Sequence, residues 1–183
     1  LTGFKFIGEQ ITMLSEKGEP ERYILGFEES YGYLIGDHAR DKDAVVASML
    51  ICEMAAYYKS VGKTLGDVLD EIYKEYGYYY AAQTSFTCEG QSGMEQIKNI
   101  MQSLSANPPK EICNSKVIKF DDYGNSVSTN LINNEKTVLT LPRSNVLCFF
   151  MENGSSFIVR PSGTEPKIKI YVCAVGSSDQ DAK

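Results

Sequence analysis

The sequence predicts an α/β segment followed by an α+β segment with an antiparallel sheet. The first prediction rests on an apolar run at residues 22–27, a polar loop, and a helix that begins near Asp43, an order typical of α/β layers. The second rests on one helix and several short strands bounded by turn residues. The 183 residues suffice for one large domain or two small ones, each with its own core.

Three elements are expected in the first third of the chain. Residues 4–7 are expected to form a short strand, and residues 22–27 a buried strand because they are a continuous apolar run. Residues 44–58 are the most apolar run of the chain. Because this run contains Glu53 and is too short to span a bilayer, we expect a buried helix there.

A helix in the middle of the chain is expected to connect two domains. Thr64 is typical of a helix N-cap and Gly77 of a helix end. Apolar residues recur between them at helical spacing, namely Leu65, Val68, Leu69, Ile72 and Tyr76. We therefore expect residues 63–79 to link one domain at residues 1–62 to another at residues 80–183.

The second domain is expected to contain one helix and six strands. The helix carries Met94, Ile97, Met101 and Leu104 at helical spacing, and two prolines at 108 and 109 follow it. The expected strands lie at residues 80–88, 116–120, 137–141, 146–151, 156–160 and 167–174. The last of these alternates apolar and polar residues, which predicts a half-buried strand.

Composition excludes several classes of partner. A formal net charge of −6 argues against binding to a nucleic-acid backbone or to an anionic membrane, although a local basic cluster can still hold one phosphate. The five cysteines show no metal-binding spacing, so buried free thiols in a cytoplasmic protein are favoured over zinc or disulfides. No secretory signal is recognisable at the first residues, and the absence of an initial Met indicates a piece of a longer protein.

The loop between the last two expected strands carries groups that suit an anion. Arg160 offers a planar fork of donors, and the proline after it favours an extended backbone. Ser162, Gly163 and Thr164 are small residues whose backbone N–H groups can approach a ligand, and Lys169 can add charge from the next strand. The same residues are ordinary in a hairpin turn, so both interpretations stay open on residue chemistry alone.

Residues 26–44 form a second loop rich in charged side chains. Glu28 and Glu29 follow an expected strand, and carboxylates there suit sugar hydroxyls because each accepts two hydrogen bonds. Arg40 and Lys42 are candidates to meet a phosphate or a ring oxygen. The alternative is that the two glutamates are simply solvated.

Other residues of this second loop have structural alternatives. His38 is a candidate general base, but a hydrogen bond that organises the loop is favoured. Asp41 and Asp43 lie just before the expected helix, where a capping or first-turn role is favoured for both.

Together, the two loops resemble those of the α-D-phosphohexomutases, in particular the phosphoglucomutase branch. FEESYG at residues 27–32 is similar to the family's sugar-recognition loop G-E-E-S-F-G, and GDHARDKDA at residues 36–44 to its next segment, whose lysine falls at Lys42. RPSGTEPKIKIY at residues 160–171 is similar to the phosphate-binding loop of the family's fourth domain, and LTGFKFIG at residues 1–8 to part of its third.

The resemblance implies a domain assignment. The family has four domains, of which the first three are α/β and the last resembles the TATA-binding-protein fold. Residues 1–62 would be the C-terminal part of the α/β/α domain III with the sugar-binding loop, residues 63–79 the connecting helix, and residues 80–183 domain IV with the phosphate-binding loop.

The resemblance also implies an activity, namely the isomerase reaction of a phosphoglucomutase. A phosphoryl group would pass reversibly between a phosphoserine and the C1 or C6 oxygen of glucose phosphate, through glucose 1,6-bisphosphate. The implied substrate-binding residues are Glu28, Ser30, Lys42, Arg40 and His38. The implied phosphate-binding residues are Arg160, Ser162, Gly163, Thr164 and Lys169.

The catalytic motifs of that family are not found in this sequence. The serine loop T-A-S-H-N-P is missing, and so is the Mg²⁺ loop D-G-D-x-D; the nearest pair, Asp121 and Asp122, runs into Tyr-Gly and indicates a turn. The resemblance therefore implies that the catalytic serine and the Mg²⁺ ligands lie in N-terminal mutase domains. We expect no catalytic residue and no metal ligand in this chain, and no mutase activity from the chain alone.

Two alternatives stay open. The parent protein is either a mutase or a non-catalytic phosphosugar-binding module. If it is a mutase, its sugar is glucose, mannose or a pentose; Glu29 disfavours mannose, and the sequence does not separate hexose from pentose phosphates.

Overall fold

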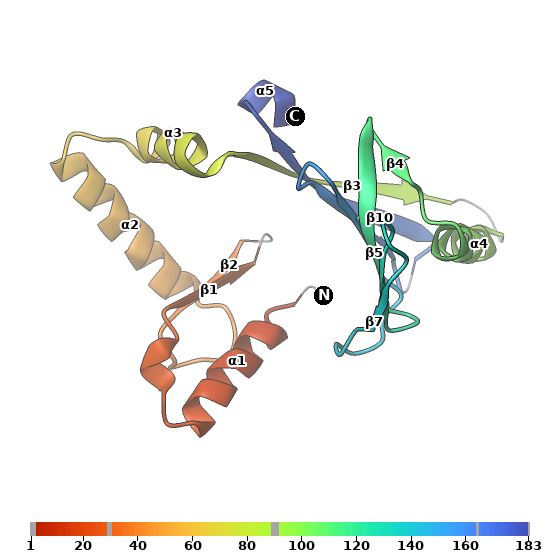
Figure 1. Cartoon of the computed structure of the whole chain (residues 1–183). Helices are drawn as coiled ribbons and strands as arrows, with labels where there is room; N and C mark the ends of the chain where they lie inside the picture. Colours follow the sequence, from red (N-terminus) through yellow and green to blue (C-terminus); the bar gives the residue numbers. More distant parts are fainter. Residues whose placement is uncertain (1–2, 29–30, 89–91, 164, 183) are drawn as a thin grey trace. The chain divides into compact units, whose positions relative to one another are not determined.

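The computed structural model describes residues 3–28, 31–88, 92–163 and 165–182. The chain divides into two compact units, Leu1–Glu71 and Ile72–Lys183, and the division falls inside a helix (Figure 1). The expected domain boundaries at residues 62 and 80 stay predictions. Among the described residues, no single helix is both long and apolar enough to cross a membrane, and one pair of helices meets that criterion only when the two are joined across a bend.

The first unit contains a β-hairpin and helices. Its elements are α1 (Lys5–Glu16), the 3₁₀ turn η1 (Pro20–Arg22), β1 (Leu25–Glu28), β2 (Gly32–Ile35), α2 (Ala44–Ser60) and α3 (Leu65–Tyr76), which continues into the second unit. β1 and β2 pair antiparallel, with Leu25 opposite Ile35 and Glu28 opposite Gly32. Phe4, Ile11 and Leu34 form a small core between α1 and the hairpin.

The strand expected at residues 4–7 is wrong, because these residues belong to the start of α1. Phe4, Ile7 and Ile11 follow one another at helical spacing, and all three face the same small core. Gly8 of α1 lies close to the loop that contains Arg40. A Cβ on Gly8 would stand 2.6 Å from the Arg40 carbonyl oxygen. Four residues were too few to separate a helix from a strand by periodicity.

The burial expected for two apolar runs is also wrong in this structure. The strand predicted at residues 22–27 is β1, four residues long, and its Phe27 is 64% exposed. Residues 44–58 do form a helix, α2, but Ala47 is its one buried residue and Val45 is 81% exposed. The physical reason is that the described elements include only a two-stranded sheet to cover this helix.

α3 forms where the sequence predicts it. The Thr64 hydroxyl oxygen accepts from the Asp67 N–H at 3.1 Å, and Asp67 Oδ2 accepts from the Thr64 N–H at 2.8 Å. This reciprocal pair is a capping box. Gly77 ends the helix with a left-handed backbone, φ 101°, as expected of a glycine at that position.

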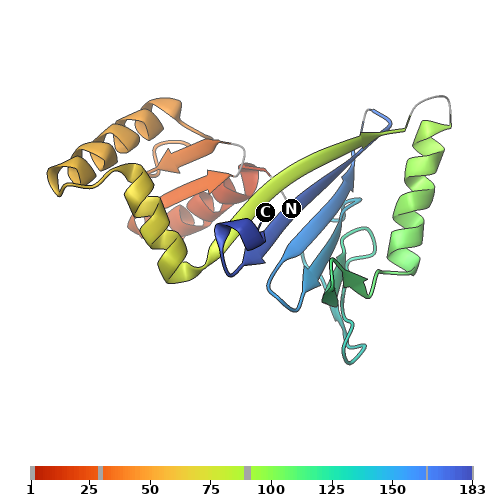
Figure 2. The same cartoon turned by 90° about the horizontal axis from the view of Figure 1, so that it is seen from above.

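The second unit is an antiparallel sheet with a helix on one face, so the predicted α+β architecture is confirmed (Figure 2). Its elements are β3 (Tyr78–Thr87), α4 (Gly93–Ala106), β4 (Glu111–Ile112), β5 (Ser115–Asp122), β6 (Val127–Asn130), β7 (Lys136–Val138), β8 (Leu147–Met151), β9 (Ser156–Pro161), β10 (Lys167–Gly176) and α5 (Asp179–Ala182). In the part of the chain that the structure describes, the strand order is β3-β10-β9-β8-β5-β6-β7, with β4 beside β5.

The core of this unit lies between α4 and the sheet. Ile97 and Met101 of α4 pack against β5, β8, β9 and β10. Phe149 is fully buried and stacks on Phe120 and on Phe157, with ring centroids 4.9 and 4.5 Å away. Of the α4 residues that the sequence placed at helical spacing, Ile97, Met101 and Leu104 pack in this core, whereas Met94 is 52% exposed.

Strands β2, β4 and β6 were not predicted. Val127–Asn130 has the sequence VSTN, which contains too few apolar residues to distinguish a strand from a loop. It becomes a strand because β5 and β7 pair with it on its two sides.

All five cysteines lie in the described part of the chain, and all are free thiols, as expected. The expectation that they are buried holds for Cys148 and is wrong for Cys52 and Cys113, which are exposed. Burial raises the pKa of the Cys148 thiol to about 11, with a further contribution from Asp121.

Candidate functional site

Residues 28–43 of the first unit run from the end of β1 to the start of α2 and include β2. This segment is called here the sugar loop, after its predicted role. Glu28 is the last residue of β1 and is paired with Gly32 at the start of β2. Ser30, a predicted substrate-binding residue, and its neighbour Glu29 lie outside the described residues. Tyr31 has a left-handed backbone, φ 65°, as a residue in a tight hairpin turn can have.

Glu28 and Lys42 form an ion pair, with 3.4 Å between Lys42 Nζ and Glu28 Oε2. The Glu28 side chain is 12% exposed and that of Lys42 is 48% exposed. A Cβ built on Gly32 would stand 2.1 Å from Lys42 Cδ and 3.3 Å from Glu28 Oε2. The lysine stem therefore crosses the bare backbone of Gly32 to reach the glutamate. The sugar loop thus places a hydrogen-bond acceptor and a charged donor side by side.

Asp43 organises the end of the sugar loop. It is the N-cap of α2, and its Oδ1 accepts from the N–H groups of Val45 at 2.9 Å and Val46 at 3.2 Å. His38 Nε2 lies 3.0 Å from the other oxygen, Oδ2. The hydrogen bond to His38 and those to the helix N–H groups hold the pKa of Asp43 below its ordinary value. Asp43 therefore caps the helix and His38 organises the loop, as the sequence favoured, whereas Asp41 accepts from the Lys42 N–H instead of capping.

Arg40 is directed toward α1. Its guanidinium donates to the carbonyl oxygens of Asp37, at 2.7 Å, and Ala39, at 3.0 Å. It also donates to the hydroxyl groups of Thr12, at 3.2 Å, and Ser15, at 3.4 Å. These bonds fasten the sugar loop to α1. The predicted contact of Arg40 with a substrate stays a prediction. Such a contact would compete with these four hydrogen bonds.

Residues 160–169 of the second unit comprise the end of β9, the connection to β10 and the start of β10. This segment is called here the anion loop, after its predicted role. Arg160 on β9 lies directly opposite Lys169 on β10. Residues opposite each other in an antiparallel pair project from the same face, with Cβ atoms roughly 5 Å apart. Ser85 of β3 lies beside Lys169 on its other side. The sheet register therefore brings two of the predicted phosphate-binding cations together.

The backbone of the anion loop is closed by short hydrogen bonds. The Ser162 N–H donates to the Lys167 carbonyl oxygen, and the Lys167 N–H to the Glu165 carbonyl oxygen, both at 2.7 Å. Ser162 Oγ accepts from the Glu165 N–H at 3.3 Å. Gly163 is exposed at the tip, and Thr164, a predicted phosphate-binding residue, lies outside the described residues. These hydrogen bonds therefore link the two described sides of the loop.

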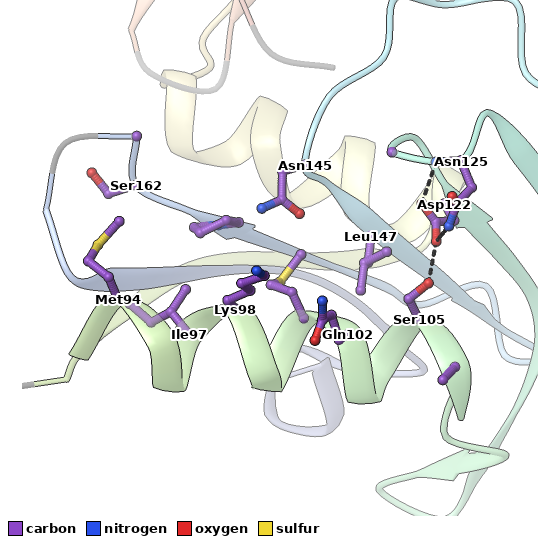
Figure 3. Close-up of a pocket in the computed structure, with 15 residues that line it drawn as sticks. Met94, Ile97, Lys98, Gln102, Ser105, Asp122, Asn125, Asn145, Leu147 and Ser162 are labelled. Atoms are coloured by element: carbon purple, nitrogen blue, oxygen red, sulfur yellow. Dashed lines mark hydrogen bonds between the residues drawn. The ribbon is translucent and has the colours of Figure 1, made fainter. Parts of the chain in front are cut away.

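A groove of about 660 Å³ runs between α4 and the anion loop (Figure 3). Met94 and Ser162 lie at one end, and Ser105, Asp122 and Asn125 at the other (Figure 3). Asp122 accepts from the Ser105 hydroxyl and from Asn125. Burial alone would raise its pKa, but these hydrogen bonds outweigh burial and hold the pKa below the ordinary value. The turn expected after Asp121 and Asp122 is therefore present, and the D-x-x-N sequence at 122–125 is the signal that could have identified Asp122 as the residue that caps it.

No group of three or more His, Cys, Asp or Glu side chains that could hold a metal ion occurs among the described residues. The Asp121–Asp122 pair is divided between two environments, since Asp121 pairs with Lys119 at 3.2 Å while Asp122 caps the turn.

The chain thus joins an α/β unit to an antiparallel α+β unit, and each unit carries a polar loop. Residues 1–76 match the family model "Phosphoglucomutase/phosphomannomutase, alpha/beta/alpha domain III", and residues 116–183 match "Phosphoglucomutase/phosphomannomutase, C-terminal domain". The chain belongs to the phosphoglucomutase/phosphomannomutase family, as its resemblance predicted.

Similar proteins agree with this assignment. The phosphoglucomutase of Staphylococcus epidermidis is 42% identical over 173 residues, which are 94% of this chain and 31% of that protein. A phosphoglucomutase of Staphylococcus aureus is 43% identical over 173 residues, 94% of this chain and 30% of that protein. The chain therefore spans less than a third of the length of these relatives.

A solved structure has a similar fold. The open form of the exocytosis-sensitive phosphoprotein pp63/parafusin, a phosphoglucomutase from Paramecium, matches with a TM-score of 0.64 and 20% sequence identity. The match covers 100% of this chain and 30% of that one. At this identity the likeness supports the fold alone.

Proposed function

We propose that this chain is the substrate-binding C-terminal portion of a phosphoglucomutase, which interconverts glucose 1-phosphate and glucose 6-phosphate. The observation that carries the proposal is the pairing of Arg160 with Lys169 across β9 and β10, beside the small residues Ser162 and Gly163. Two cations on neighbouring strands beside an exposed glycine suit a phosphate dianion.

In this proposal the anion loop holds a phosphate that is not being transferred. The Arg160 guanidinium donates two parallel hydrogen bonds to phosphate oxygens, and Lys169 adds a point charge. Gly163 donates its backbone N–H, and Ser162 and Thr164 donate their hydroxyl groups. Energy from binding this remote phosphate positions the reacting oxygen elsewhere on the sugar.

The sugar loop binds sugar hydroxyls. Glu28 accepts from them, and Lys42 donates to a ring or hydroxyl oxygen from the adjacent position. Ser30, His38 and Arg40 are the other proposed members of this set. Because Lys42 already lies across Gly32 against Glu28, little side-chain entropy is lost when a sugar binds.

The bond-making groups belong to the larger part of the protein. The relatives are about three times longer than this chain. We propose that a catalytic serine, the Mg²⁺ ligands and the other mutase domains belong to that additional length. Mg²⁺ would neutralise charge on the transferring phosphoryl group. The 183-residue chain on its own is accordingly inactive as a mutase, and glucose 1,6-bisphosphate is the intermediate of the complete enzyme.

A titration of the 183-residue chain with glucose 6-phosphate, followed by NMR, tests the phosphate assignment. We expect Arg160→Ala to raise the Kd about tenfold or more, which corresponds to the loss of one charge-assisted hydrogen bond, roughly 1.5–3 kcal/mol. The matched control is Arg143→Ala, an exposed arginine between β7 and β8, which should leave the Kd unchanged. Equal affinities for the Arg160 variant and the wild-type chain would refute the assignment.

Mannose phosphate is the second candidate, because the family description includes phosphomannomutase, and a pentose phosphate is the alternative that the sequence leaves open. Comparing kcat/KM for glucose, mannose and ribose phosphates on the complete enzyme decides the sugar. A complete protein that binds these phosphosugars but turns none of them over would instead indicate a non-catalytic binding module.

A further inference from the structure

The anion loop is attached to a part of the fold outside its own hairpin. The Cys88 N–H, one residue beyond the end of β3, donates to the Pro166 carbonyl oxygen at 2.8 Å. This bond extends the β3–β10 ladder, in which Thr87 lies opposite Lys167, into the anion loop itself. The position of Pro166 therefore depends on the position of Cys88.

Gly93, the first residue of α4, packs against both of these residues. A Cβ built there would stand 2.1 Å from the Cys88 carbonyl oxygen and 3.1 Å from Pro166 Cβ. Gly93 is buried, and its φ is not in the left-handed region, so space and not backbone conformation requires the glycine. The atom nearest the added carbon is backbone, which cannot swing aside as a flexible side chain can.

Helix α4 is packed more deeply in the core than the anion loop is. Ile97 and Met101 fix the helix in the core, at 4% and 5% exposure. In contrast, Pro166 is partly buried and Gly163 is exposed. A side chain at position 93 would therefore displace Cys88 and Pro166, and with them the loop between Arg160 and Lys169.

We propose that Gly93 is a positioning residue for the anion loop, which it holds in place through Cys88 and Pro166. The inference rests on the proposed function, because it assumes that the loop binds phosphate. Displacement by about 1 Å moves a donor from about 2.9 Å out of hydrogen-bonding distance of the ligand. Gly93 is thus expected to set affinity without touching the ligand.

The test compares glycine variants at two helix starts. Gly93→Ala should raise the Kd of the 183-residue chain for inorganic phosphate and for glucose 6-phosphate at least tenfold. Gly66→Ala is the matched control, since Gly66 lies in the first turn of α3 and a Cβ there would meet only Thr64 Oγ1, at an ordinary 3.6 Å. An unchanged Kd for Gly93→Ala would overturn the inference.

A core variant separates positioning from stability. Val117→Ala shortens a buried side chain of β5, a strand that β8 separates from β9 and β10, so it should lower the unfolding midpoint and leave the phosphate Kd unchanged. A Kd that rises in Val117→Ala as much as in Gly93→Ala would mean that lost stability alone weakens binding, and the inference would fail.

A second measurement needs no variant, in case Gly93→Ala does not fold. Inorganic phosphate should slow hydrogen exchange of the wild-type Cys88 amide, because that amide bonds the loop at Pro166. Unchanged exchange at a saturating phosphate concentration would overturn the inference. The Arg160→Ala variant tests the proposed function separately: if it binds phosphate as tightly as wild type, the phosphate assignment fails first.

Discussion

Replacing Gly32 with alanine is expected to separate Lys42 from Glu28 without unfolding the hairpin. The added Cβ would stand 2.1 Å from Lys42 Cδ, whereas ordinary contacts begin at 3.4 Å. The lysine stem must therefore move by more than about 1 Å. The Nζ–Oε2 distance is already 3.4 Å, so a shift of this size breaks the ion pair.

The expected cost to stability is small. The Lys42 side chain is 48% exposed, and solvent screening limits such a pair to about 0.2–1 kcal/mol. The displaced atoms belong to a flexible side chain, so the backbone of Gly32 can stay in place. The cost to sugar binding is larger, because Glu28 and Lys42 no longer lie side by side. We expect about a tenfold higher Kd for glucose 6-phosphate, equivalent to roughly 1.4 kcal/mol.

A double-mutant cycle measures whether Gly32 acts through Lys42. The four proteins are wild type, Gly32→Ala, Lys42→Met and the double variant, each titrated with glucose 6-phosphate and unfolded with urea. If the mechanism is right, the double variant binds no more weakly than Lys42→Met, because the lysine is already lost. Additive effects, or an unchanged Kd in Gly32→Ala, would refute the reasoning.

Three further predictions concern the second unit. Phe149→Ala should lower the free energy of unfolding by about 3–5 kcal/mol in a urea titration, because a fully buried ring stacked on two others is lost; a cost below about 1 kcal/mol would contradict the packing described. Asp122 has a folded-state pKa below its ordinary 3.8, so its contribution to stability is present above that pH and is lost as pH falls through the lower folded value. Urea midpoints should therefore fall below about pH 4 in wild type and less steeply in Asp122→Asn; parallel pH profiles would oppose this assignment. The Cys148 thiol, with a pKa of about 11, should resist iodoacetamide at pH 8 while Cys52 and Cys113 react. Mass spectrometry measures the labelling of each cysteine, and labelling of Cys148 at least as fast as that of Cys52 and Cys113 would mean that burial does not protect it.

Local patterns predicted the second unit better than the first. β10 alternates apolar and polar residues, and α4 repeats apolar residues at helical spacing, so each was recognisable from its own residues. Residues 4–7 were too few to distinguish the two periods, and β6 has too polar a sequence to be recognised without its neighbours. The burial of α2 was overestimated. A helix that is apolar on all sides is expected to be covered by other elements, and the described residues do not supply them.

The candidate loops were predicted by residue type, but their internal contacts were not. Sequence placed Glu28 and Lys42 in one loop, and it placed Arg160 and Lys169 on neighbouring strands. It could not show that Lys42 reaches Glu28 across Gly32, because that contact depends on how the hairpin meets the loop after β2. It also gave Arg40 as a substrate contact, whereas the structure engages its guanidinium with α1 and with its own loop.

The sequence by itself determined the family, the α+β character of the second unit and the residues of both loops, because motif composition and hydrophobic period are local properties of the chain. The tertiary structure decided which of those residues meet. The contact of Gly93 with Cys88 and Pro166 joins a helix start, a strand end and a loop more than 70 residues further along the chain. No local pattern indicates such a contact. In the sequence, a glycine that is needed because a side chain would not fit looks the same as a glycine that merely begins a helix. Close packing of separate segments is what gives that glycine its role.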